Sequence, residues 1–288
     1  MYRKTGHFLA IITIAALSLT SCVKYRLFST PHPDKGTVEA QADFSARSAA
    51  AAAPAEYMLQ HICCGATDDL WSMPAAEAEC VPALFNPGTH SFLAWSSCEN
   101  VSVAYGTAKV SEVSSGKIHP MPGYLFAARQ NAEVAQDDTT RISIMMSQRS
   151  RDLRFELTVT EGNPELIAAV EGTLSGIAGT FSLTEQTPSG TPASTVLTFT
   201  RDGNLLTADA RLLGIIGAEQ SLELEIRFTD RDDVSHATVA LSEAMSGFNS
   251  DMTSARKISG SLNTPVGMDV TAEITGWKDV EGDPAEAE

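Results

Sequence analysis

The sequence predicts an all-β protein made of two antiparallel β-sandwich domains, and three observations carry this prediction. Hydrophobic residues recur at every second position in several segments, which is the period of a strand with one buried face. Short segments rich in Gly, Pro, Asn and Asp separate these segments, and helical spacing is nearly absent. Short strands at this spacing in a chain of 288 residues indicate two sandwiches of ordinary size.

Six segments show the strand period most clearly. They are residues 38–44, 101–105, 153–159, 206–212, 222–228 and 266–274. In the third, we expect the alternating hydrophobic residues from Leu153 to Val159 to face the core, with Arg154, Glu156 and Thr158 turned toward solvent. The alternating positions of the last segment are Val266, Met268, Val270, Ala272 and Ile274.

Turn residues are expected to separate these strands. The predicted turns lie at residues 86–88, 162–164, 188–190, 202–204 and 230–232. The segment from Gly172 to Gly176 resembles a nucleophile elbow only superficially, because its serine lacks a glycine two places before it. We interpret it as a strand with a bulge. Residues 242–249 have helical spacing, with Ser242 as a cap, and we interpret them as a turn that closes a sandwich.

Domain boundaries follow from changes in composition. A polar stretch at residues 130–141 interrupts the strand pattern near the middle of the chain, and we place the boundary close by, at about residue 147. The expected organisation is a signal peptide (1–21), a tether (22–34), an N-terminal sandwich (35–147), a C-terminal sandwich (148–280) and an acidic tail (281–288).

The N-terminus has the pattern of an exported lipoprotein. Arg3 and Lys4 precede an apolar run of twelve residues, which suits a signal peptide and is too short to cross a bilayer. The sequence Leu19-Thr20-Ser21-Cys22 then matches a bacterial lipobox, with cleavage after Ser21. Only a thiol can form the thioether to diacylglycerol, so Cys22 is the predicted attachment site, and two or three acyl chains would give stable anchoring. An ordinary signal peptide followed by a chance cysteine is the alternative.

Charge excludes one class of partner. The formal net charge of −16 becomes −18 when cleavage removes two basic residues and no acid. Such a field repels phosphate backbones, so we expect no nucleic-acid binding.

No residue pattern points to catalysis, a metal or a cofactor, so we expect a protein that is not an enzyme. The cysteines Cys63, Cys64, Cys80 and Cys98 remain after lipidation, and we expect reduced thiols, with a disulfide through Cys80 or Cys98 as the alternative. The five mature-chain histidines lie outside any metal motif or nucleophile signature. Acid pairs at 137–138 and 232–233 lack the spacing of a calcium loop.

Several segments, in this order, resemble the fimbrillin superfamily of Bacteroidales bacteria, particularly its minor lipoprotein subunits that anchor fimbriae. They are the lipobox followed by His32–Gly36, Asn86–Thr89 leading into Phe92–Trp95, Pro122–Ala127, Gly172–Ala178 and Ile274–Gly282. The resemblance implies two transthyretin-like sandwiches at the outer membrane, lipid-anchored and exposed at the cell surface. It also implies fimbrial structural subunits as partners, joined by exchange of a β-strand.

The resemblance raises the question of which strand is exchanged. Structural subunits of the superfamily lose their first strand to a protease that cuts after Arg, and Arg47 follows the first predicted strand here. An anchor must keep its chain intact from Cys22, so we expect that strand to complete its own sandwich. The alternating positions from Val266 to Ile274 are the candidate partner strand, although an ordinary closing strand has the same pattern.

A second function stays open at this point, namely a glycan-binding surface lipoprotein. Such a protein would present aromatic platforms, for which Trp71, Trp95 and Trp277 are the candidates. Trp95 lies in an alternating segment and is expected to be buried.

Overall fold

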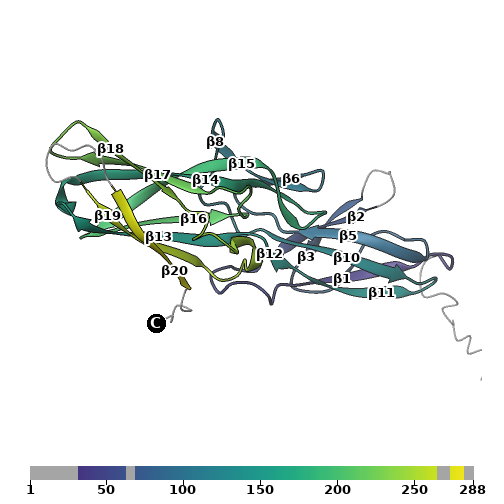
Figure 1. The fold of residues 1–288 in the computed structure, drawn as a ribbon. Coiled ribbons are helices and arrows are strands. Elements are labelled where there is room, and N and C mark those ends of the chain that lie inside the picture. Colours follow the sequence, from purple (N-terminus) through teal and green to yellow (C-terminus); the bar gives the residue numbers. More distant parts are fainter. Residues whose placement is uncertain (1–31, 63–68, 265–272, 282–288) are drawn as a thin grey trace, which may run out of the picture.

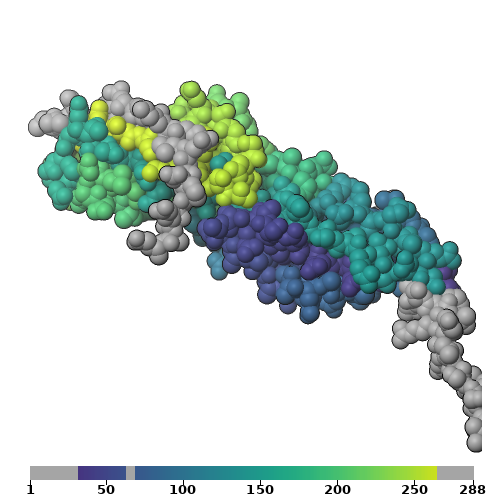
Figure 2. Space-filling model, turned by 90° about the horizontal axis from the view of Figure 1, so that it is seen from below, coloured from purple at the N-terminus to yellow at the C-terminus, as the bar shows by residue number. Residues whose placement is uncertain are grey.

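A computed structural model describes residues 32–62, 69–264 and 273–281, the last of these as backbone only. The molecule is elongated, with two systems of β-sheets arranged end to end (Figure 1, Figure 2). Helical structure in the described residues is confined to two 3₁₀ turns, η1 (Pro164–Leu166) and η2 (Phe248–Ser250). No helix long and apolar enough for a membrane span occurs in this part of the chain. The predicted all-β, sandwich-type fold is confirmed.

The N-terminal system packs a three-stranded sheet, in the order β11-β1-β4, with a five-stranded sheet, β12-β10-β5-β2-β3. Its strands are β1 (Thr37–Asp43), β2 (Glu56–Ile62), β3 (Leu70–Pro74), β4 (Glu79–Cys80), β5 (Gly88–Trp95), β10 (Phe126–Val134), β11 (Thr139–Met145) and β12 (Ser147–Gln148). The first predicted strand is confirmed, because Val38, Ala40, Ala42 and Phe44 are all buried in the core of this system.

The C-terminal system is one continuous set of pairings, with the main order β18-β17-β14-β15-β16-β13-β19-β20. Its strands are β6 (Val101–Ala104), β7 (Thr107–Val110), β8 (Glu112–Ser114), β9 (Lys117–Ile118), β13 (Arg151–Glu161), β14 (Ile167–Ser182), β15 (Thr187–Asp202), β16 (Leu205–Leu212), β17 (Ser221–Phe228), β18 (Val234–Ala240), β19 (Arg256–Asn263) and β20 (Glu273–Glu281). Most pairs are antiparallel, but β1 with β11, β13 with β19 and β15 with β9 are parallel.

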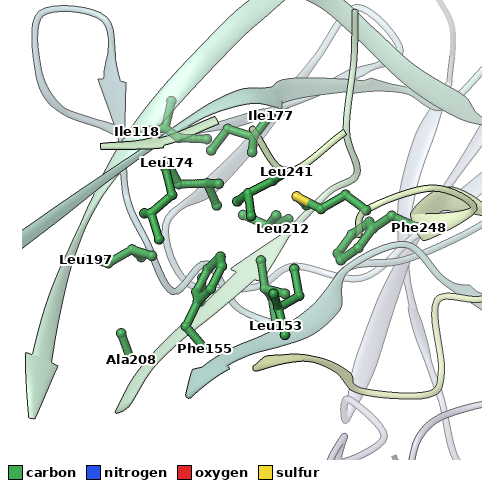
Figure 3. Close-up of a cluster of buried hydrophobic side chains, with 14 of the residues drawn as sticks. Ile118, Leu153, Phe155, Leu174, Ile177, Leu197, Ala208, Leu212, Leu241 and Phe248 are labelled. Carbon is green, nitrogen blue, oxygen red and sulfur yellow. The ribbon is translucent and has the colours of Figure 1, made fainter. Parts of the chain in front are cut away.

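The core of the C-terminal system confirms the predicted register. Leu153, Phe155, Leu157 and Val159 of β13 are buried, whereas Arg154 is exposed. The alternating positions of β16 and β17 are buried in the same way. Figure 3 shows Leu153 and Phe155 of β13 in one cluster with labelled residues of β9, β14, β15 and β16 and the turn residue Phe248. The segment 242–249 is a turn, as predicted, and it brings Met245 and Phe248 into the core.

Two strands serve both cores, which explains why their sequences do not alternate. Phe92 and Ala94 of β5 belong to the N-terminal core, and Leu93 and Trp95 belong to the C-terminal one. The same division holds along β10. A strand buried on both faces reads as a continuous apolar run.

The chain leaves the N-terminal system after β5 and returns to it at β10. Between these strands, β7 pairs with β14 and β9 pairs with β15. We therefore propose to keep the domain boundary near residue 147 and to assign residues 101–118 to the C-terminal sandwich.

Side chains also join the two systems at their junction. The Arg211 guanidinium lies 3.6 Å from the centre of the Tyr124 ring, and its Nε donates to Asp152 at 2.7 Å. The Arg211 Nη1 donates to the carbonyl oxygen of Pro122. Arg129 of β10 donates to the carbonyl oxygen of Thr184 in the turn between β14 and β15.

Three local predictions are wrong. Residues 188–190 form no turn, because Pro188 and Ser189 pair with Phe181 and Thr180 inside the ribbon of β14 and β15, and the chain reverses at 183–186. Tyr105 lies outside the strand β6, in a turn with φ of 50°. The polar stretch 130–141 consists mostly of β10 and β11. Gly176 does form the expected bulge, with φ of 80°.

Candidate functional site

The predicted attachment and partner residues are only partly within the described chain. Ser21, Cys22, Cys63 and Cys64 lie outside the described residues, as do the partner-strand candidates Val266, Met268, Val270 and Ala272. Ile274 lies in β20, where it is opposite Leu262 of β19. The strand β20 ends at Glu281, the first residue of the predicted acidic tail, and the rest of that tail lies outside the described residues.

The strand β20 is the outermost strand of its sheet. It pairs antiparallel with β19, from Arg256 opposite Glu281 to Asn263 opposite Glu273. The strand at the other end of the order, β18, lies near β20, but no ladder joins the two among the described residues. The outer side of β20 therefore has backbone groups with no ladder partner in this part of the chain, which is the feature that allows strand addition.

The strand β1 is built into its own sandwich. All seven of its residues pair with β11, and its buried face fills the N-terminal core. On its other side, the ladder to β4 is confined to Glu39 and Ala40. A shallow hollow of about 500 Å³ follows there, lined by Gln41, Asp43 and Arg47 among others. The Arg47 side chain donates to the carbonyl oxygens of Phe44 and Ala51, which braces the exposed loop after β1.

The cysteines and acid pairs form no reactive centre in the described chain. Cys80 is exposed and Cys98 is partly buried, and both are free thiols. Burial raises the pKa of the Cys98 thiol to about 11, against a lowering by the nearby Arg211. Across the described ranges, no three His, Cys, Asp or Glu side chains are grouped in a way that would hold a metal ion.

The aromatic side chains give little support to a glycan platform. Trp95 is buried, as predicted, and Trp71 is half-buried with its ring against Phe85. Among the residues whose burial the structure describes, the exposed aromatic side chain is Tyr105, at the tip of the hairpin between β6 and β7. Trp277 lies in β20.

The sequence analysis did not predict one polar contact, between two histidine side chains. His61 of β2 and His90 of β5 form a hydrogen bond of 2.9 Å at one end of the N-terminal core. The signal was present, because His61 continues the inward alternation of Tyr57 and Leu59. Its partner could not be predicted, since that requires the register between β2 and β5.

Comparison with known proteins identifies the family. The sequence profile of the family described as fimbrillin-A associated anchor proteins Mfa1 and Mfa2 matches residues 79–282, which is more than half of the chain. The chain belongs to this family. The resemblance predicted from the sequence is therefore confirmed. A search of curated protein sequences found no match.

Solved structures share the fold of this anchor-family protein at low sequence identity. The fimbrial anchor protein Mfa2 from Porphyromonas gingivalis has a TM-score of 0.58 at 11% identity, with 86% of this chain and 98% of that chain covered. An adhesin candidate from Bacteroides ovatus has a TM-score of 0.62 at 11% identity, covering 93% and 99%. A candidate polysaccharide-binding protein from Bacteroides thetaiotaomicron has a TM-score of 0.56 at 12% identity, covering 87% and 100%.

Family membership supports a fimbrial anchor or accessory adhesin role. It indicates association with fimbrial subunits at the cell surface or outer membrane. It also indicates a structural role and not an enzymatic one.

Proposed function

We propose that this protein is a lipid-anchored outer-membrane subunit that holds a fimbria at the cell surface. Membership in the anchor family supports the fimbrial part of the proposal. The lipobox ending at Cys22 supports the lipid part, because its thiol is the group that forms the thioether.

The arrangement of the strands supports different functions for the two ends of the molecule. The described chain begins beside β1, at the end formed by the N-terminal sheets, and β20 lies in the C-terminal system (Figure 1). In this proposal the lipid holds the first end, and the outer edge of β20 accepts a strand from a fimbrial subunit. The full pairing of β1 with β11 supports an anchor that keeps its first strand.

The backbone of β20 favours the closing-strand interpretation over donation of the segment from Val266 to Ile274. Residues 273–281 are already paired with β19 in the same chain, so donating them would break that ladder. An edge strand that stays in place and receives a partner retains all of these bonds.

Lipidation is tested by Cys22→Ser in the native host. The expected result is loss of labelling by radioactive palmitate and release from the outer membrane, because a hydroxyl does not form the thioether. Cys80→Ser is the matched control, since it removes an exposed thiol from the folded part of the chain. Unchanged membrane retention of the Cys22 variant would defeat the anchor proposal.

Attachment is tested by purifying the chain from outer membranes and measuring the fimbrial subunits that accompany it. Replacing Val270 and Ile274 by Asp should abolish co-purification, because Ile274 lies in the accepting strand β20 and charged side chains on an edge strand disfavour strand addition. Deleting residues 282–288, which follow β20, is the control and should leave co-purification intact. Loss of the subunits after this trimming, with the circular dichroism spectrum preserved, would contradict the assignment.

Glycan binding is the second candidate, and one observation favours it: the full exposure of Tyr105 at a hairpin tip. A glycan array with the wild-type chain and Tyr105→Ala separates the two functions. Tyrosine-dependent binding to a sugar would favour the glycan-binding interpretation, and an empty array would favour the anchor alone.

A further inference from the structure

The pair formed by His61 and His90 has defined hydrogen positions. The two residues lie on neighbouring strands, and the register places His61 opposite Phe92, two positions from His90. His90 Nε2 lies 2.7 Å from the carbonyl oxygen of Asn86, which can only accept a hydrogen bond, so this nitrogen carries the proton. In neutral His90 the other nitrogen, Nδ1, then accepts. The bond of 2.9 Å is therefore donated by His61 Nε2.

The geometry is that of a shared hydrogen and not of a chelated metal. The ring centroids are 5.0 Å apart and the facing nitrogens 2.9 Å apart, so the two nitrogens point toward one another. Two histidines that bind one metal ion point their lone pairs at a third position instead. The described residues also supply no third His, Cys, Asp or Glu ligand.

The pair supports the residue that fixes the start of β1. The Phe85 ring packs edge-on against both imidazoles, with centroid distances of 5.1 Å to His61 and 5.3 Å to His90. The Phe85 backbone in turn pairs with Gly36, the residue before β1, through bonds of 2.9 and 3.0 Å. Gly36 is tightly enclosed, because a Cβ atom there would lie 2.1 Å from the carbonyl oxygen of Ala135.

We propose that His61, His90 and Phe85 form an acid-sensitive latch that holds the start of β1 against the N-terminal core. One added proton on His61 leaves the bond in place, because Nε2 of a charged His61 still donates to Nδ1 of His90. A second proton places N–H groups on both facing nitrogens, so the bond is lost and two positive charges meet in a largely buried site. The contacts of Phe85 with the rings then weaken, and the pairing of Phe85 with Gly36 weakens with them.

Charged residues lie in the segments that backbone bonds join next to the latch. The Asp69 carbonyl oxygen accepts from His61 N–H, and Asp137 and Asp138 bond to the backbone of Lys35 and Thr37, beside Asp34. Glu133 accepts a hydrogen bond from Thr89, whose side chain is on the opposite face of β5 from His90. The second proton opens the latch.

The sign of the pH dependence follows from proton counting. The closed latch excludes the doubly charged pair, whereas the open chain accepts both protons, so the open form binds more protons. The latch is therefore closed at neutral pH and loosens in acid.

Hydrogen exchange of the full-length chain tests the latch. Exchange is compared at pH 7.5 and pH 5.0 after correction for the intrinsic rates. We expect the protection of the segment containing Gly36 to fall by about tenfold at the lower pH, the size of effect that loss of one hydrogen bond produces. The internal control is the segment 153–159 of β13, whose protection should not change.

Two variants make the test specific. His90→Gln removes one titratable ring and should abolish the pH dependence at Gly36. His236→Gln makes the same change at an exposed histidine of β18 and should leave the wild-type response. Equal protection of Gly36 at both pH values in the wild-type chain would overturn the proposal, and so would a pH response that survives in His90→Gln.

A further measurement covers the competing use of the same side chains. Zn²⁺ added at pH 7.5 should leave the unfolding midpoint unchanged in the wild-type chain. A rise in the midpoint that is absent from His90→Gln would identify a metal site and overturn the latch. The comparison of hydrogen exchange at the two pH values in the wild-type chain tests the proposal even if a variant fails to fold. The proposal does not depend on lipidation, so its outcome is distinct from that of the Cys22 experiment.

Discussion

Replacing Phe155 by Ala tests the core of the C-terminal sandwich most directly. The Phe155 side chain is 0% exposed, and its ring lies 6.4 Å from that of Phe199. Its strand, β13, is held by ladders on both sides, with Ala208 of β16 and Ile258 of β19 opposite Phe155. Because both neighbouring strands are fixed, we expect little collapse into the space that the ring leaves.

The expected cost follows from this packing. A buried Phe→Ala change costs about 3–5 kcal/mol through lost transfer free energy and the residual cavity. The rigid surroundings place Phe155 in the upper half of that range, so we expect the free energy of unfolding to fall by about 4–5 kcal/mol. Urea titration followed by circular dichroism measures this change, and an unchanged slope would show that the unfolded state is unaffected.

The neighbouring residue Arg154 provides the matched control. It is exposed on the same strand, with ion pairs of 3.2 Å to Asp209 and 3.3 Å to Glu156. Surface pairs contribute little, so Arg154→Ala should cost no more than about 1 kcal/mol. A larger loss from Arg154→Ala than from Phe155→Ala would refute the register of β13, because a slip by one residue exchanges the two faces.

Two further predictions concern a glycine and a pair of thiols. A Cβ atom on Gly176 would lie 2.2 Å from the carbonyl oxygen of Glu219, so Gly176→Ala should lower the free energy of unfolding by more than about 3 kcal/mol. The control is Gly203→Ala, because Gly203 has a comparable positive φ and nothing within 4 Å of the added Cβ atom. It should lower the free energy of unfolding by about 1 kcal/mol in the same urea assay. Similar costs at both sites would contradict the tight bulge. For the thiols, iodoacetamide at pH 8 should label the peptide with exposed Cys80 well before that with Cys98, since a pKa of about 11 leaves Cys98 with at least about a hundredfold less thiolate than an ordinary thiol. Mass spectrometry of the two peptides measures the rates, and equal labelling would show that Cys98 is accessible.

Period-two alternation was sufficient to predict the strands whose one face is buried. The positions from Leu153 to Val159 needed no information beyond their own spacing, because one side of β13 faces the core throughout. Strands that serve two cores, such as β5, lose this period, so the alternating segment expected around Trp95 is instead a continuous buried run from Phe92 to Trp95.

Turn chemistry was less dependable, because glycine and proline also suit irregular strands. Gly190 occupies a positive φ of 85° beside Thr180, within the ribbon, and the actual reversal at 183–186 contains neither glycine nor proline. In the opposite case, Tyr105 continued an alternating pattern but sits at the reversal itself, because Gly106 after it completes the turn.

The candidate site was predictable in its chemistry and less so in its geometry. The lipobox is a local motif, so Cys22 could be singled out without a fold. The pairing of β20 with β19, and the contact of His61 with His90, depend on registers between distant segments, which spacing along the chain does not encode.

The excursion of residues 101–118 limits how this protein can evolve. Because β7 and β9 complete sheets on the far side of the junction, a genetic crossover near residue 147 would separate them from β14 and β15. A chimera of residues 1–147 with the C-terminal sandwich of a relative would keep the hairpins β6–β7 and β8–β9. It would lack β14 and β15 of this chain, the strands with which these hairpins pair. We therefore expect the two sandwiches to be inherited as one unit, with variation between relatives accumulating within the pair and not by exchange of its halves.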